Sequence, residues 1–247
     1  MLNLEFAPPR TAEVFQALAR QPLMSGFNLI GGTALSLQIG HRLSEDLDFW
    51  LPAEQMSSTR IDAIVEDLKS NGHHIQLATP AWRITQARIN NQDLLSLSRD
   101  YSINGVKVTF FARNDAPYQH FATLGRHQTP DTNFQIMDIN AIFEMKAWLI
   151  SKRIRSRDLY DLMILLRDYG KTVRDIFDAG LAADASYSIE FAKDVLLGAA
   201  PIDADDEGFN SIQLDIKMEE IYAFMLHCVN QYEIDIAKEI FRSAPEI

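Results

Sequence analysis

The sequence predicts an α+β fold in which a mixed β-sheet flanked by helices precedes a mostly helical C-terminal lobe. Three observations predict it. Short apolar or alternating runs that suit strands are confined to the first half, two adjacent glycines interrupt one of these runs, and apolar residues recur at helical spacing in the second half. We therefore expect an α/β lobe over residues 1–135 and a helical lobe over 136–247.

The first strand of the α/β lobe is expected just before a pair of glycines. Residues 28–30 form a short, largely apolar run that ends at Gly31 and Gly32, as in a buried strand that enters a turn with close backbone approach or positive φ. Thr33 is expected to cap a helix over residues 34–39. The free N–H groups at the start of that helix would favour an anion.

Two aspartates alternate with apolar residues in the next predicted strand, over residues 46–51. Asp46 and Asp48 lie two apart and so share a strand face, which Ser44 joins if the strand begins early enough. Their backbones would be about 6.6 Å apart, and at an effective dielectric of ~20 the carboxylates repel by about 2.5 kcal/mol. A divalent cation would turn this repulsion into attraction, and hard oxygen ligands suit Mg²⁺. The alternative is two solvated acids on a half-exposed edge strand.

The remaining elements follow from the same periodicities. In the α/β lobe we expect helices over 10–20 and 57–71, and strands near 74–78, 82–89, 93–103 and 106–112, the last two joined by a turn at 104–105. In the helical lobe we expect helices near 139–152, 156–169, 171–182, 186–197 and 211–242. Asp138 or Asn140 can cap the first of these helices, and Ser156 the second.

Charge is unevenly distributed along a chain whose formal net charge is −11. Such a charge argues against a general nucleic-acid-coating protein, because phosphate binding draws on lysine and arginine. Residues 146–157 are basic, however, and RNA, if it binds, should follow these helices. The acidic cluster at 203–207 is expected to be a solvated loop, with partner binding as the alternative.

Composition limits the setting of the protein. Of 247 residues 47% are hydrophobic, which suffices for a large core. We expect no membrane association, because the N-terminus lacks a secretory pattern and no apolar run approaches ~18 residues. Cys228 is the only cysteine, so an internal disulfide is excluded and a reducing compartment, the cytoplasm, is expected.

Two sequence blocks resemble a known family. The first runs from Ile30 to Phe49 and contains a Gly-Gly turn, a short helix and an Arg-x-Ser-x-Asp-x-Asp segment; the second contains Lys146 and the stretch 157–162, Arg-Asp-Leu-Tyr-Asp-Leu. Together they resemble the AbiEii/AbiGii toxin-type nucleotidyltransferases of the DNA polymerase β-like superfamily. The resemblance covers residues 27–166 well and the remainder poorly.

The resemblance implies a role for each matched residue. It implies that Asp46 and Asp48 hold Mg²⁺ and act in catalysis, and that Lys146 contacts the triphosphate of an NTP. Asp158 or Asp161 would complete the acidic site or position the lysine, and both alternatives stay open. The further nucleotide-binding residues it implies are Gly31, Gly32, Thr33, Arg42 and Ser44. Without the resemblance, Lys146 would be a surface lysine and Arg157 would pair with Asp161 across one helical turn.

One position departs from the superfamily pattern. Many polymerase β-like enzymes carry a third metal-holding acid on a later strand, where this chain has Thr109. Either a second metal is held weakly, or the helical acids replace the missing ligand, or catalysis has been lost.

The resulting functional prediction is a magnesium-requiring nucleotidyltransferase that moves a nucleotide from an NTP to an acceptor. The resemblance favours RNA, such as tRNA, as acceptor, and a toxin of a toxin–antitoxin or phage-defence system with a cognate antitoxin as partner. The alternatives are a weak or inactive binding protein on the same scaffold, and a small-molecule nucleotidyltransferase of the antibiotic-modifying type.

Overall fold

The protein is described by a computed structural model that covers residues 2–212 and 214–243. The chain divides into two compact units, which we call unit 1, up to Ile142, and unit 2, from Phe143 onwards. The division falls inside the helix α7 (Ile139–Leu149), whereas the sequence analysis places a boundary before it, between residues 135 and 136.

The bounds of the elements are as follows. The strands are β1 (Asn28–Ile30), β2 (Leu47–Leu51), β3 (Ile75–Leu77), β4 (Ser98–Ile103), β5 (Val106–Ala112), β6 (Arg126–His127) and β7 (Gln135–Met137). The other α-helices are α1 (Pro9–Ala19), α2 (Gly31–Ile39), α3 (Ser58–Ser70), α4 (Ala81–Ile89), α5 (Leu94–Leu97), α6 (Ala116–Phe121), α8 (Ser156–Asp168), α9 (Val173–Ala183), α10 (Ile189–Leu196) and α11 (Met218–Ser243).

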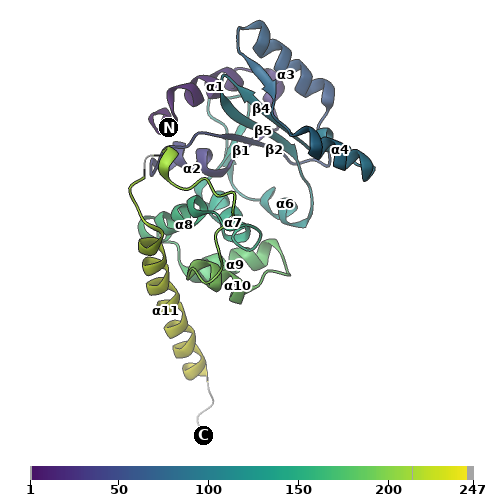
Figure 1. Ribbon diagram of the computed structural model, residues 1–247. Coiled ribbons are helices and arrows are strands. Elements are labelled where there is room, and N and C mark those ends of the chain that lie inside the picture. The colour runs from purple at the N-terminus through teal and green to yellow at the C-terminus, as the bar shows by residue number, and fades with distance from the viewer. Residues whose placement is uncertain (1, 213, 244–247) are drawn as a thin grey trace. The chain divides into compact units, whose positions relative to one another are not determined.

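Unit 1 is built on a mixed sheet, as the predicted fold class requires (Figure 1). The strand order is β3-β4-β5-β2-β1-β7-β6. β2 pairs parallel with β5 and antiparallel with β1, so its two neighbours run in opposite directions. The α+β prediction is therefore confirmed, and β2, which carries Asp48, lies in the interior of the sheet rather than at an edge. The alternative of an edge strand is therefore wrong, although both acids remain partly exposed.

Aromatic side chains form the core of unit 1. Phe49 of β2 stacks on Phe110 of β5, with ring centroids 5.6 Å apart, and meets Phe134 edge-to-face at 4.9 Å. All three rings are fully buried. Aromatic pairs of this kind contribute about 0.5–1.5 kcal/mol each beyond the burial of their area. Because Phe49 points into the core, its neighbour Asp48 must point to the other face of the sheet.

Most predicted elements of unit 1 are confirmed, but two segments differ. Residues 82–89 were expected to be a strand and instead form α4, which begins after Pro80. Proline suits a helix start, and only Ala87 of α4 is buried, so the apolar pattern of this exposed helix carried little information. The expected strand over 93–103 begins with the short helix α5 before it becomes β4.

Unit 2 is helical, and its central helix is α8. Every residue of α8 from Asp158 to Leu166 is buried. The helix packs against α11, and α9 begins with a capping box between Thr172 and Asp175. Among the helices of the described residues, none is both long and apolar enough to span a membrane.

The caps of the two helices around the second sequence block can now be assigned. Asp138 caps α7, because its Oδ1 accepts a hydrogen bond of 2.8 Å from the backbone N–H of Ala141. The expectation that Ser156 caps α8 is wrong. The cap position is Arg155, and Ser156 is the first helical residue. The backbone N–H of Ser156 instead donates to Asp206, a carboxylate fifty positions further along the chain.

Candidate functional site

The glycine pair forms the start of α2. Gly31 has a φ of +75°, which a residue with a side chain adopts only under strain, and it is already the first helical residue. A Cβ at Gly31 would lie 3.2 Å from Asp48 Oδ2, so the missing side chain also lets the turn approach this carboxylate. Thr33 therefore lies inside the first turn of α2 and is not the helix cap that the sequence analysis expects.

The Thr33 hydroxyl instead ties the helix to the segment that leads into β2. It donates to the backbone carbonyl of Asp46 and lies 2.8 Å from Ser44 Oγ. Both hydroxyl-bearing residues are buried, with 3% of Thr33 and 6% of Ser44 exposed. These bonds fix the backbone next to the first aspartate.

Gly32 leaves room for the buried arginine of the same block. A Cβ at Gly32 would collide with the Arg42 guanidinium and would lie 3.3 Å from Ser44 Oγ. The guanidinium also donates a hydrogen bond of 2.9 Å to the carbonyl of Leu43. The structure thus brings together Gly32, Arg42 and Ser44, three of the residues assigned to nucleotide binding.

The two aspartates lie beside this turn. Asp48 in β2 is paired with Ile30 of β1 on one side and Thr109 of β5 on the other. Asp46 immediately precedes β2, and its carboxylate lies 3.8 Å from Lys107 Nζ, with 35% of the Asp46 side chain exposed. Both carboxylates are therefore partly open to solvent, beside the start of a helix.

The register of the sheet reveals an acid that the sequence analysis did not single out. Thr109 pairs with Asp48 on one side and with Asp100 of β4 on the other, so the three side chains form one row on the same face. Two strand spacings put the Asp48 and Asp100 backbones about 10 Å apart. Asp100 Oδ2 lies 3.9 Å from Arg83 Nη1. The alternation of β4 could have indicated its face, but only the register reveals the row.

The carboxylates suit a hard divalent cation that keeps much of its hydration. Among residues 2–212 and 214–243, no three His, Cys, Asp or Glu side chains converge in a geometry that could hold a metal. Two carboxylates, with the remaining positions taken by water and triphosphate oxygens, nevertheless match the way Mg²⁺ binds in nucleotide-dependent enzymes. Asp46 and Asp48 therefore fit Mg²⁺, provided that the nucleotide supplies part of the coordination.

A pocket elsewhere in unit 1 does not involve these residues. It has a volume of about 820 Å³ and is lined mainly by α1 and by residues 129–133. Neither aspartate and no residue of the glycine turn contributes to its wall. The pocket is therefore separate from the candidate site.

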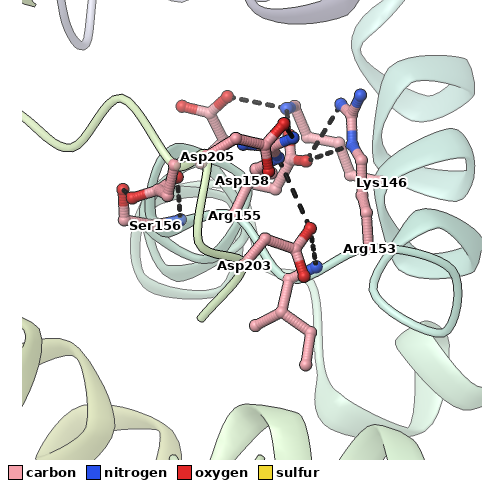
Figure 2. A network of polar contacts seen from close by, with 10 residues as sticks. Lys146, Arg153, Arg155, Ser156, Asp158, Asp203 and Asp205 are labelled. Atoms are coloured by element: carbon pink, nitrogen blue, oxygen red, sulfur yellow. Dashed lines mark hydrogen bonds and ion pairs between the residues drawn. The ribbon is translucent and has the colours of Figure 1, made fainter. Parts of the chain in front are cut away.

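In unit 2, Lys146 of α7 lies between two carboxylates of α8 (Figure 2). Its Nζ is 2.5 Å from Asp158 Oδ1 and 2.8 Å from Asp161 Oδ2. Lys146 is 3% exposed and Asp161 is fully buried, and Arg153 adds a second cation 3.0 Å from Asp158 Oδ2. The alternative of an ordinary surface lysine is wrong. Both helical acids contact Lys146.

The charges of this cluster keep Asp158 ionised. Burial alone raises the pKa of a carboxyl group, but the positive charges of Lys146 and Arg153 and the hydrogen bond from Lys146 outweigh burial and lower the pKa of Asp158 below its usual value. The Lys146 side chain in turn donates to two carboxylates, and charge-assisted hydrogen bonds of this kind are stronger than neutral ones.

The acidic cluster at 203–207 lies in a loop with exposed acids, as expected, but its carboxylates also contact basic residues of the same unit. Asp205 lies 2.7 Å from Arg155 Nη2, and Glu207 lies 2.8 Å from Arg157 Nη1. Lys152, in the same basic stretch, lies 2.8 Å from Asp184. The basic helices proposed as an RNA path are thus paired with carboxylates of their own unit.

Comparisons with known proteins place these observations in a family. Residues 13–231 match the family described as "Nucleotidyl transferase AbiEii toxin, Type IV TA system". The chain is 26% identical over 165 residues to an uncharacterised protein of Aquifex aeolicus, aq_aa25, a match that covers 66% of this chain and 69% of that protein.

Two solved structures from Helicobacter pylori share the fold. One, provisionally assigned as a nucleotidyltransferase, has a TM-score of 0.53 at 18% identity and covers 93% of this chain and 96% of its own. The other, JHP933, has a TM-score of 0.51 at 15% identity and covers 98% and 97%.

Proposed function

Because the chain belongs to the AbiEii family of nucleotidyl transferase toxins, we propose that it moves a nucleotide from an NTP to RNA, with tRNA as the acceptor class. The acceptor hydroxyl gives its proton to solvent as its oxygen forms a bond to the α-phosphorus, the bond between that phosphorus and the oxygen that bridges it to the β-phosphorus breaks, and pyrophosphate leaves. The observation that carries the proposal is that Asp48 of β2 lies beside the glycine turn at the start of α2, while Asp46 directly precedes β2 and is partly exposed.

Different residues of unit 1 would bind the metal ion and the phosphates. Asp46 and Asp48 would hold Mg²⁺, which when bound neutralises triphosphate charge and polarises the α-phosphate. The backbone N–H groups of Gly31 and Gly32 face an anion at the start of α2. Arg42 and Ser44, with Thr33 holding Ser44 in place, would complete the phosphate contacts.

In unit 2 we assign the triphosphate contact to Lys146, as the family resemblance implies. Asp158 and Asp161 then act as positioning residues, because each holds the ammonium group within 2.8 Å. A lysine fixed in this way loses little side-chain freedom when it meets a phosphate, which lowers the cost of binding. The setting we propose is the cytoplasm, where NTP, tRNA and a cognate antitoxin would be met.

The test is transfer of label from each α-labelled NTP to bulk tRNA in the presence of Mg²⁺. The proposal predicts labelled tRNA with at least one NTP and no labelling by Asp46→Asn, whose circular dichroism should match that of the wild type. Pyrophosphate release without labelled RNA would instead indicate a small-molecule acceptor. Absence of both labelled RNA and pyrophosphate release across all NTPs would contradict the proposal.

A second candidate is a nucleotide-binding protein without turnover. Thr109, directly beside Asp48 in the sheet, favours it, because threonine supplies no charge for a second metal. Calorimetry distinguishes the two: this candidate predicts binding of NTP with Mg²⁺ and no release of pyrophosphate. The toxin role is tested separately by growth arrest on expression, which Asp48→Ala should relieve.

A further inference from the structure

The acidic cluster contacts a short basic stretch of unit 2 (Figure 2). We call residues 203–207 the acidic segment and residues 153–157 the basic segment. Four carboxylates of the acidic segment make these contacts. Asp203 Oδ2 accepts a hydrogen bond of 3.2 Å from the Ile154 N–H, and Asp205 Oδ2 lies 2.7 Å from Arg155 Nη2. Asp206 accepts from the Ser156 N–H at 3.1 Å and from the Ser156 hydroxyl at 2.6 Å, and Glu207 lies 2.8 Å from Arg157 Nη1.

The groups that receive these carboxylates are those that bind phosphate. The basic segment contains three guanidinium groups, of which those of Arg155 and Arg157 contact the acidic segment; it also offers a serine hydroxyl and the backbone N–H at the start of α8, a helix of 13 residues. Guanidinium groups bind carboxylate and phosphate in the same geometry, and a helix N-terminus attracts either anion. The acidic segment thus presents a row of anions to a phosphate-type surface.

The four carboxylates differ in how firmly they are held. Asp203 and Asp206 accept hydrogen bonds from backbone N–H groups and are partly buried, so they anchor the acidic segment. The side chains of Asp205 and Glu207 are 79% and 57% exposed and contact guanidinium groups at the surface. Exposed ion pairs contribute little net stability and are weakened by salt. Another anion can therefore replace Asp205 and Glu207, while Asp203 and Asp206 keep the acidic segment attached.

We propose that the basic segment is a binding surface for the phosphodiester backbone of RNA, and that the acidic segment occupies it as an internal competitor in the free protein. This inference rests on the proposed function in one respect, the choice of RNA as the polyanion. RNA then binds by displacing Asp205 and Glu207 from Arg155 and Arg157. The pairing also explains how a chain of net charge −11 can keep a local site for a polyanion without binding every nucleic acid tightly.

The test compares the full-length protein with the double variant Asp205→Asn/Glu207→Gln. Fluorescence anisotropy of labelled bulk tRNA, without NTP or Mg²⁺, reports the dissociation constant between 50 and 200 mM KCl. Two guanidinium groups released to phosphates should lower the dissociation constant and steepen the dependence of log K on log salt by about 1.4–1.8. The matching extra loss of affinity over this salt range is about seven- to twelve-fold.

A matched control has the same change in net charge elsewhere in unit 2. Asp168→Asn/Glu239→Gln removes two exposed acids that pair with Arg167 and Arg174, each at 2.8 Å. Equal tightening of tRNA binding in both double variants would reduce the effect to net charge and overturn the inference. Unchanged affinity and salt slope in Asp205→Asn/Glu207→Gln would overturn it as well.

A third variant tests the surface itself. Adding Arg155→Gln and Arg157→Gln to the Asp205→Asn/Glu207→Gln background should remove the gain in tRNA affinity. Retention of the gain would contradict the inference, and matching circular dichroism and melting temperatures establish that each variant is folded. Because the assay measures binding alone, a failure of nucleotide transfer would leave this result interpretable by itself.

Discussion

The buried cluster around Lys146 makes the strongest stability prediction. Replacing Lys146 with Met keeps a flexible side chain of similar length but removes the cation that lies within 2.8 Å of both Asp158 and Asp161. Those carboxylates are 5% and 0% exposed, so water cannot replace the lost charge. Breaking a buried ion pair by removing one partner costs about 3–5 kcal/mol, and we expect Lys146→Met to lose that much free energy of unfolding.

The assay is chemical denaturation at pH 7, with hydrogen exchange of peptides from α8 as a local readout. The control is Lys152→Met, the same substitution in a pair with Asp184 where 39% of the lysine is exposed; it should cost about 0–1 kcal/mol. Adding Asp161→Asn to Lys146→Met should restore part of the loss, because it removes one of the two buried negative charges.

Equal effects of the two lysine substitutions would refute this reasoning, because they would show that burial does not strengthen the Lys146 contacts. Additive destabilisation by Asp161→Asn would refute it independently, since the argument requires that carboxylate to be unfavourable once the lysine is gone.

Three further predictions concern pH and the glycine turn. The pKa of Asp158 is lower in the folded than in the unfolded protein, where it is about 3.9, so the ionised group stabilises the fold above that pH and the contribution is lost as pH falls toward the folded pKa. The difference in unfolding free energy between wild type and Asp158→Asn should therefore shrink from pH 6 to pH 3. A constant difference would contradict the assignment. Gly31→Ala should cost about 1–2 kcal/mol through its positive φ, measured by thermal unfolding, with no loss counting against the strained turn. Thr33→Val should cost about 1–3 kcal/mol in urea unfolding, because the carbonyl of Asp46 loses its buried donor; a neutral effect would argue against that bond.

Local patterns predicted the part of the site that is local in sequence. The glycine turn, α2 and β2 are contained in residues 28–51, so the approach of Asp48 to the turn follows from a short stretch of sequence. The alternation of β5 also predicts which face Thr109 occupies, because each strand has one buried and one partly exposed face, but only the pairing of β2 with β5 puts Thr109 beside Asp48.

Contacts between distant parts of the chain could not be predicted in this way. Asp100 joins the row of Asp48 only through the register of two further strand pairings. The acidic segment contacts residues about fifty positions earlier in the chain, and its composition alone does not indicate these contacts. The error at α4 has another origin: its alternating, β-branched residues suit a strand, but the helix is mostly exposed and its apolar residues do not mark a core face.

The proposed function requires that Asp46 and Asp48 bind a divalent cation together with a nucleotide. Electron paramagnetic resonance of Mn²⁺, with a non-hydrolysable NTP analogue present, measures the concentration of free Mn²⁺ and so tests this binding directly, because protein-bound Mn²⁺ loses the signal of the free aqueous ion. We predict that the wild type and the surface control Asp168→Asn deplete the free signal beyond what the nucleotide does alone, and that Asp48→Asn does not. Equal depletion by wild type and Asp48→Asn would contradict the claim.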